Sequence, residues 1–127
     1  MEADVSGHQR KVMRSTVRPA RSSHGTEGIA IRNGKALPFL VTRGWNAPEG
    51  YYQETFYIVA PDTGEVFYEA PPEVRLIWGL QSITDVSTTV AEPLELAPGT
   101  YKIVFALGGI KGGEVDVEAF DVEAQAA

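Results

Sequence analysis

The sequence contains no cysteine and only two histidines. Without cysteine the protein forms no disulfide and has no thiolate to bind a metal ion. Both histidines, His8 and His24, lie in the first 25 residues, so the rest of the chain lacks the side chain that most often acts as a general base. A Ser–His pair would require this segment to fold onto Ser82 or Ser87. We therefore do not expect catalysis.

Long apolar runs are missing as well. No stretch has the length of a membrane-spanning helix, and the basic N-terminal region is not followed by the apolar run of a signal peptide. We expect a protein of the cytoplasm, or one held at the cytoplasmic side of a membrane complex or within a virion. The 127 residues are 43% hydrophobic and 22% charged, which suits one globular domain.

Positive charge is scarce outside the N-terminal segment. Residues 1–24 carry five basic and two acidic side chains, a net charge of +3, whereas residues 25–127 carry six basic and fifteen acidic ones, a net charge of −9. The five basic residues are Arg10, Lys11, Arg14, Arg18 and Arg21. Because residues 1–25 show no regular apolar period, we expect an extended basic arm that contacts a partner through these side chains.

Alternating apolar residues dominate the remainder of the chain. Tyr101, Ile103, Phe105 and Leu107 recur at a period of two, and the turn sequences Asn33-Gly34 and Pro98-Gly99 separate such runs. Runs of this kind at intervals of about 8–12 residues, with no helical period, predict an all-β fold. We expect an antiparallel two-sheet sandwich of about seven to nine strands over residues 26–124, followed by a tail at 125–127.

One short segment resembles a known family. Leu96-Ala97-Pro98-Gly99-Thr100-Tyr101, followed by alternating apolar residues, is similar to the entry of the penultimate strand in bacterial immunoglobulin-like and fibronectin-III-like sandwiches. The resemblance implies an immunoglobulin-like fold and a role in adhesion or assembly, or as an accessory subunit. The Cys…Trp…Cys arrangement of antibody domains is missing.

A second apolar pattern is expected to form the core. Val74, Leu76, Trp78 and Leu80 occupy alternate positions, and the opposite stripe consists of Glu73, Arg75, Ile77 and Gly79. The sequence predicts that this apolar stripe faces inward, with Trp78 near the centre of the core.

Aromatic residues suggest an alternative function. Trp45, Tyr51 and Tyr52 cluster around a Gly- and Pro-containing loop, and Tyr57 follows on a strand that is apolar on both faces. Such a cluster could stack on a sugar or a peptide, so these four residues form a candidate aromatic interface.

Other ligands are not expected. Glu114, Asp116 and Glu118 share one face of the last strand, but their alternation with Val115 and Val117 is that of a half-solvated strand. We predict no metal site and no cofactor. The acidic body argues against nucleic acid as a partner.

The leading hypothesis is a non-enzymatic accessory or structural subunit that docks on a larger protein assembly, with the basic arm as a tether. Two settings fit equally well. One is a peripheral subunit of a membrane-embedded complex, whose arm touches anionic lipid, and the other is a decoration protein on a viral or cellular shell. The alternative is a small carbohydrate- or peptide-binding module that uses the aromatic interface.

Overall fold

The fold is all-β, as the alternating pattern predicts. The computed structural model describes residues 9–21 and 26–122, and these contain ten strands and no helical element. The strands are β1 (Lys11–Pro19), β2 (Ile29–Arg32), β3 (Lys35–Ala36), β4 (Phe39–Asn46), β5 (Gly50–Val59), β6 (Val66–Glu69), β7 (Glu73–Ile77), β8 (Thr84–Val90), β9 (Gly99–Leu107) and β10 (Ile110–Asp121). The number exceeds the expected seven to nine because β1 and the two-residue β3 were not anticipated.

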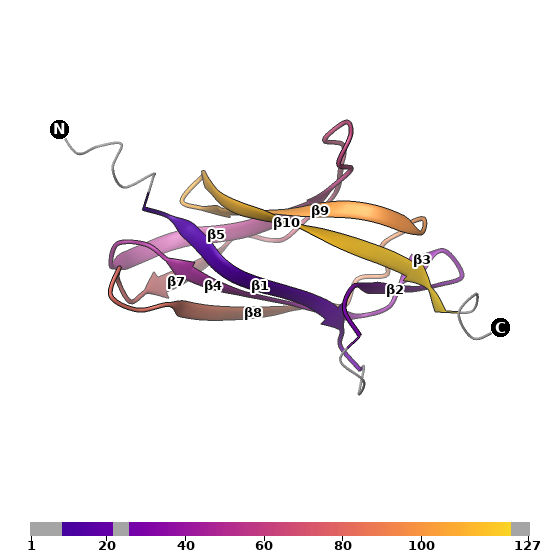
Figure 1. The fold of residues 1–127 in the computed structure, drawn as a ribbon, viewed down its shortest axis with the longest axis horizontal. Coiled ribbons are helices and arrows are strands. Elements are labelled where there is room, and N and C mark those ends of the chain that lie inside the picture. The colour runs from indigo at the N-terminus through magenta and orange to yellow at the C-terminus, as the bar shows by residue number, and fades with distance from the viewer. Residues whose placement is uncertain (1–8, 22–25, 123–127) are drawn as a thin grey trace.

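The strands form two sheets that enclose the core. The smaller sheet has the order β1-β4-β8, and the larger one has the order β3-β2-β10-β9-β5-β6, with β7 also paired to β5. In Figure 1, β5, β9 and β10 run above β1, β4 and β8. The pairing is antiparallel except between β2 and β10, which are parallel, so the expectation of a wholly antiparallel fold is wrong at this pair.

The core lies between the sheets and follows the predicted alternation in β9. Ile103, Phe105 and Leu107 are fully buried, and so are Phe39 and Phe56 from β4 and β5. The Asn33-Gly34 turn between β2 and β3 is also confirmed, because both residues have positive φ, at 54° and 76°, as a tight hairpin turn requires.

The predicted basic arm is largely a strand of the smaller sheet. Residues 11–19 form β1 and pair with β4 along their whole length, so this part of the arm is not a free tether. The inward positions include Val17, which is 5% exposed. The period of two is hidden in the sequence because the register shifts between Val12 and Arg14, which inserts Met13 as an extra residue. Residues 1–8 and 22–25 of the arm, and the tail at 125–127, lie outside the described residues.

Candidate functional site

Strand β7 turns its most apolar side to the outside. Ile77 is fully buried, whereas Val74 is 62% exposed and Leu76 is 46% exposed. The other two residues of the predicted stripe, Trp78 and Leu80, lie beyond the strand and are 58% and 43% exposed. The prediction that this stripe faces the core, with Trp78 at its centre, is therefore wrong.

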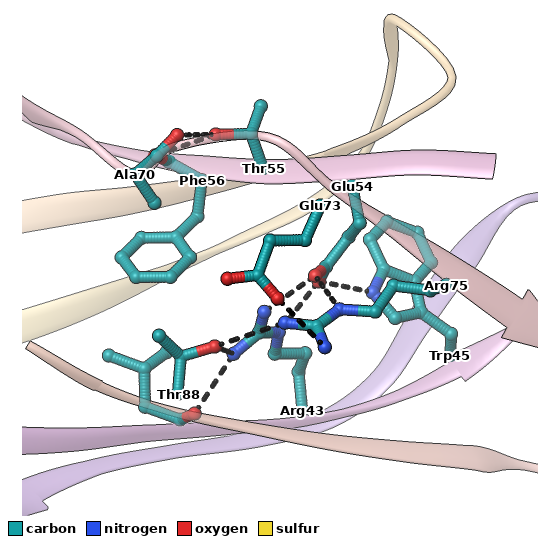
Figure 2. A network of polar contacts seen from close by, with 10 residues as sticks. Arg43, Trp45, Glu54, Thr55, Phe56, Ala70, Glu73, Arg75 and Thr88 are labelled. Carbon is teal, nitrogen blue, oxygen red and sulfur yellow. Dashed lines mark hydrogen bonds and ion pairs between the residues drawn. The ribbon is translucent and has the colours of Figure 1, made fainter.

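A buried ion-pair network explains this orientation. Arg43 on β4 and Glu54 on β5 are 2% and 1% exposed and form a two-pronged salt bridge. Arg43 donates from Nε to Oε2 of Glu54 and from Nη2 to Oε1, each at 2.6 Å. Trp45 Nε1 donates to Oε2 at 2.8 Å, and Arg75 Nε on β7 donates to Oε1 at 3.2 Å (Figure 2). Glu54 on β5 thus binds three side chains from two other strands, β4 and β7.

The remaining donors of the network are also satisfied. Arg43 Nη1 donates to the carbonyl oxygen of Val41 at 3.0 Å and to Oγ1 of Thr88 at 2.9 Å. Arg75 forms a further ion pair with Glu73 at 3.3 Å. A one-residue slip of β7 would bury the apolar stripe, but it would also separate Arg75 from Glu54 and expose Ile77. Since a buried charge without its partner is costly, the network fixes β7 with its charged side inward.

The pKa of Glu54 reflects this environment. Burial by itself raises the pKa, but the hydrogen bonds and charge of Arg43 oppose this, together with hydrogen bonds from Trp45 and Arg75, and the pKa lies below its ordinary value. The carboxylate therefore stays ionised at neutral pH. Because Arg43 belongs to the smaller sheet and Glu54 to the larger one, the ion pair joins the two sheets.

The exposed stripe extends onto the neighbouring strand. Tyr51 on β5 is 74% exposed and is the cross-strand partner of Leu76 on β7, so the two side chains lie beside each other on the outer face. We call the set Tyr51, Val74, Leu76, Trp78 and Leu80 the outer apolar surface. Exposed apolar residues gathered in this way mark interaction sites more often than ordinary protein surface.

The predicted aromatic interface is not assembled as expected. Trp45 lies in β4 rather than in a loop and is fully buried, with its indole bonded to Glu54, so it cannot stack on a ligand. Tyr52 faces the other side of β5 from Tyr51. Its hydroxyl donates to the carbonyl oxygen of Pro48 at 2.8 Å. Tyr51 and the half-buried Tyr57 lie on the same outer face of β5, six residues apart.

The predicted partner-binding basic residues differ in their contacts. Arg10 lies 4.8 Å over the Tyr52 ring and donates to the carbonyl oxygen of Leu107 at 2.8 Å. Arg14 pairs with Asp85 at 3.0 Å. The other three, Lys11, Arg18 and Arg21, are exposed and have no ion-pair partner within residues 9–21 and 26–122. These three cations are available on and beside β1.

Gly112 explains how Trp45 fits between the sheets. A methyl group at position 112 would lie 2.3 Å from Cζ3 of the Trp45 ring and 2.6 Å from Cη2, which is far inside contact distance. We expect Gly112→Ala to lower the free energy of unfolding by about 1–3 kcal/mol, the usual cost of overpacking a core. Urea denaturation measures the change. A stability equal to that of the wild type would show that the indole shifts without cost.

Comparisons with known proteins add information on the fold. No protein-family model matches the chain, and no curated protein does. Among solved structures, the DNA glycosylase AlkC of Pseudomonas fluorescens, bound to DNA with an abasic site analog, aligns with a TM-score of 0.51 at 12% identity. The alignment covers 94% of this chain and 33% of that one. A beta-glucosidase from Listeria innocua in complex with glucose gives a TM-score of 0.43 at 12% identity, over 84% of this chain and 16% of that one.

These comparisons bear on architecture alone. The chain spans about a third of the length of the glycosylase and a smaller part of the glucosidase. At such identity the likeness describes the fold and not the chemistry.

Within residues 9–21 and 26–122, no helix is long and apolar enough to cross a membrane, and no cluster of three or more His, Asp or Glu side chains is placed to hold a metal ion.

Proposed function

We propose that this chain is an immunoglobulin-like, non-enzymatic accessory subunit that docks on a larger protein assembly through the outer apolar surface. The observation that carries the proposal is the exposure of Val74 and Leu76 on β7 and of Trp78 just after it, while Arg75 on the same strand faces inward to Glu54. Tyr51 is exposed beside Leu76. Exposing apolar side chains to water is unfavourable for an isolated domain. In a domain that docks on a partner, the same side chains are buried in the interface, and their burial stabilises the complex.

The charge around the outer apolar surface indicates the chemistry of the partner. Arg75 is the single basic residue between Gly44 and Tyr101, and it is engaged by Glu54 and Glu73. Two exposed acidic side chains adjoin the surface: Glu49 lies beside Gly79, and Glu73 precedes Val74 on β7. A partner with an apolar patch bordered by lysine or arginine is complementary to this surface.

The basic residues of β1 provide a second contact. Lys11, Arg18 and Arg21 project from the smaller sheet, whereas the outer apolar surface belongs to the larger one. Fixed on and beside a strand, these cations meet an acidic surface of the same assembly, either a protein or an anionic membrane face. The contact is expected to weaken with salt, unlike the apolar contact.

The test uses the full chain in its native source. The tagged wild type is expected to migrate with a large particle in a density gradient, and the Leu76→Ser/Trp78→Ser variant is expected to migrate as a free body near its own mass of 13.8 kDa. The loss follows because both side chains that the partner would cover become polar. Mass spectrometry of the co-migrating fractions identifies the partner.

Met13→Ser is the matched control. Met13 is 55% exposed, like Trp78, but lies on β1 in the other sheet, so this variant is expected to migrate with the particle. Circular dichroism checks that all variants keep the β fold. Migration of the wild type as a free body, or co-migration of the double variant at wild-type level, would refute the proposal.

A further inference from the structure

The two sheets leave a second feature along their opposite border. β1 lies at one end of the smaller sheet and pairs with β4 alone, while β10 pairs with β2 only from Ala119 onward. Before that point, the free edge of β10 faces the free edge of β1 (Figure 1). We call this border the β1–β10 seam. It is separate from the outer apolar surface, which lies on β5 and β7.

The backbone groups of β1 that face the seam can be assigned. Gly28 N–H donates to the carbonyl oxygen of Val17 at 2.6 Å, so the polar groups of Val17 point away from β4. In an antiparallel ladder the direction alternates, so Ser15 also points into the seam and Thr16 points to β4. By the same alternation Pro19 points into the seam, so its lack of an N–H removes no hydrogen bond to β4.

The same assignment holds for β10. A methyl group on Gly28 would lie 2.5 Å from the carbonyl oxygen of Glu118, so the polar groups of Glu118 face the seam. By alternation those of Asp116 do too. The pairing of β10 with β9 gives the same result. Counted from the Leu107–Ile110 pair, and with one extra residue in the bulge between Lys111 and Gly113, the polar groups of Asp116 and Glu118 point away from β9. The parallel bridge between Ala119 and Ile29 uses the carbonyl oxygen of Glu118, so Glu118 offers only its N–H to the seam. Ser15 and Asp116 have no other strand partner on this side in the described part of the chain.

A cavity of about 230 Å³ lies between these edges. Ser15, Val17, Asp116 and Glu118 are among the residues that line it, together with Glu27. It is bounded at one end by the Gly28–Val17 hydrogen bond and at the other by the packing of Gly113 against Val12, where a methyl group on the glycine would lie 3.2 Å from Cβ of Val12. The cavity is thus a short slot between two unpaired strand edges.

The charge of the slot is negative. Asp116 pairs with Lys102 at 2.9 Å and Glu118 accepts from Thr100 Oγ1 at 2.7 Å, while Glu27 is exposed with no ion-pair partner in the structure's described ranges. Of these three carboxylates, one is neutralised by a cation. The slot therefore favours a ligand with a positively charged side chain.

We propose that the β1–β10 seam binds a short extended polypeptide segment that contains lysine or arginine, by strand addition. The segment's N–H and C=O groups pair with those of Ser15 on β1 and of Asp116 on β10, and one of its carbonyl oxygens accepts from the N–H of Glu118. Its cationic side chain lies near Glu27. The edge of β1 that lines the slot runs from Ser15 to Val17. Since the segment has the same rise per residue as a strand, roughly three of its residues fit along this edge. Strand addition satisfies backbone groups that the two sheets leave open.

The test measures amide hydrogen exchange in the full chain with the peptide acetyl-Val-Lys-Val-Lys-Val-amide. Without peptide, the amides of Ser15, Asp116 and Glu118 are expected to exchange fast, and those of Thr16 and Val117 slowly, because the latter pair within the sheets. With peptide at about ten times its Kd, exchange at the first three amides is expected to slow about tenfold. Exchange at Leu76 is expected not to change, which separates this site from the outer apolar surface.

Two controls distinguish backbone pairing from simple charge attraction. A peptide with the same side chains and N-methylated backbone amides keeps its charge but cannot pair, and it is expected to give no protection. Ser15→Pro removes an N–H that β4 does not use, so this variant is expected to fold and to bind the peptide at least tenfold more weakly.

Three results would overturn the proposal. The first is equal protection by the N-methylated peptide, and the second is no protection by the plain peptide at millimolar concentration. The third is slow exchange of the Ser15 and Asp116 amides that depends on protein concentration, because this would indicate that a second copy of the chain fills the slot. Should Ser15→Pro fail to fold, the comparison of the two peptides on the wild type still decides.

Discussion

Glu54→Ala is expected to lower the free energy of unfolding by about 3–5 kcal/mol, the usual cost of removing one partner from a buried ion pair. Glu54 accepts hydrogen bonds from Arg43, Trp45 and Arg75, and it is 1% exposed. Its removal leaves the Arg43 guanidinium in the core without its counter-charge. Urea denaturation at neutral pH measures the loss.

The pH dependence gives a second measure of the same interaction. Because the pKa of Glu54 is lower in the folded chain than its ordinary value of 4.5, its contribution is fully present above that value and is lost as the pH falls through the lowered pKa. The stability difference between the wild type and Glu54→Gln is therefore expected to be constant near neutral pH and to shrink in acid. A difference that does not change with pH would contradict this account.

Glu73→Gln is the matched control for these measurements. Its carboxylate also pairs with Arg75, at 3.3 Å, but its side chain is 59% exposed and solvent screens the pair. We expect a loss of less than about 1 kcal/mol, as for other surface ion pairs. An equal loss in both variants would show that burial is not what makes Glu54 important.

Removal of residues 1–20 is expected to abolish the cooperative unfolding transition or to lower the stability by several kcal/mol. The deletion takes away β1, its whole ladder with β4 and the buried Val17, whose side chain alone contributes about 1.5–3 kcal/mol. Small domains have only about 5–15 kcal/mol in total. Thermal denaturation followed by circular dichroism measures the effect.

A chain that begins at Arg10 is the control for this deletion. It keeps β1 together with the contacts of Arg10 to Tyr52 and Leu107, so it is expected to keep a cooperative unfolding transition. If the chain without residues 1–20 were equally stable, the first strand would be an appendage, as the basic-arm hypothesis assumed.

The best sequence predictions concern elements with a regular period and a clear turn. The alternation in β9 placed Ile103, Phe105 and Leu107 inside, and the Asn33-Gly34 dipeptide specified a hairpin. In both, the signal is local, because it depends on the pleat of a strand or on the backbone angles of two residues.

The errors concern elements whose orientation depends on distant residues. β7 presents Val74 and Leu76 to solvent because Arg75 pairs with Glu54, a residue on another strand. Trp45 follows a glycine and precedes a proline-containing loop, yet it is buried because Glu54 accepts its N–H and Gly112 leaves room for its ring. The period of β1 was obscured by a bulge.

The sequence by itself determined the all-β class, the Asn33-Gly34 turn and the division of charge between the N-terminal segment and the rest of the chain, because these follow from local backbone preferences and from composition. It did not determine the conformation at Pro98-Gly99, where Gly99 already belongs to β9. The tertiary structure alone decided which face of β7 is buried, that the basic segment is a strand, and where two sheet edges remain open. The physical reason is that a buried ion pair and the border between two sheets each require residues from separate strands. Their positions are fixed only when the two sheets pack together.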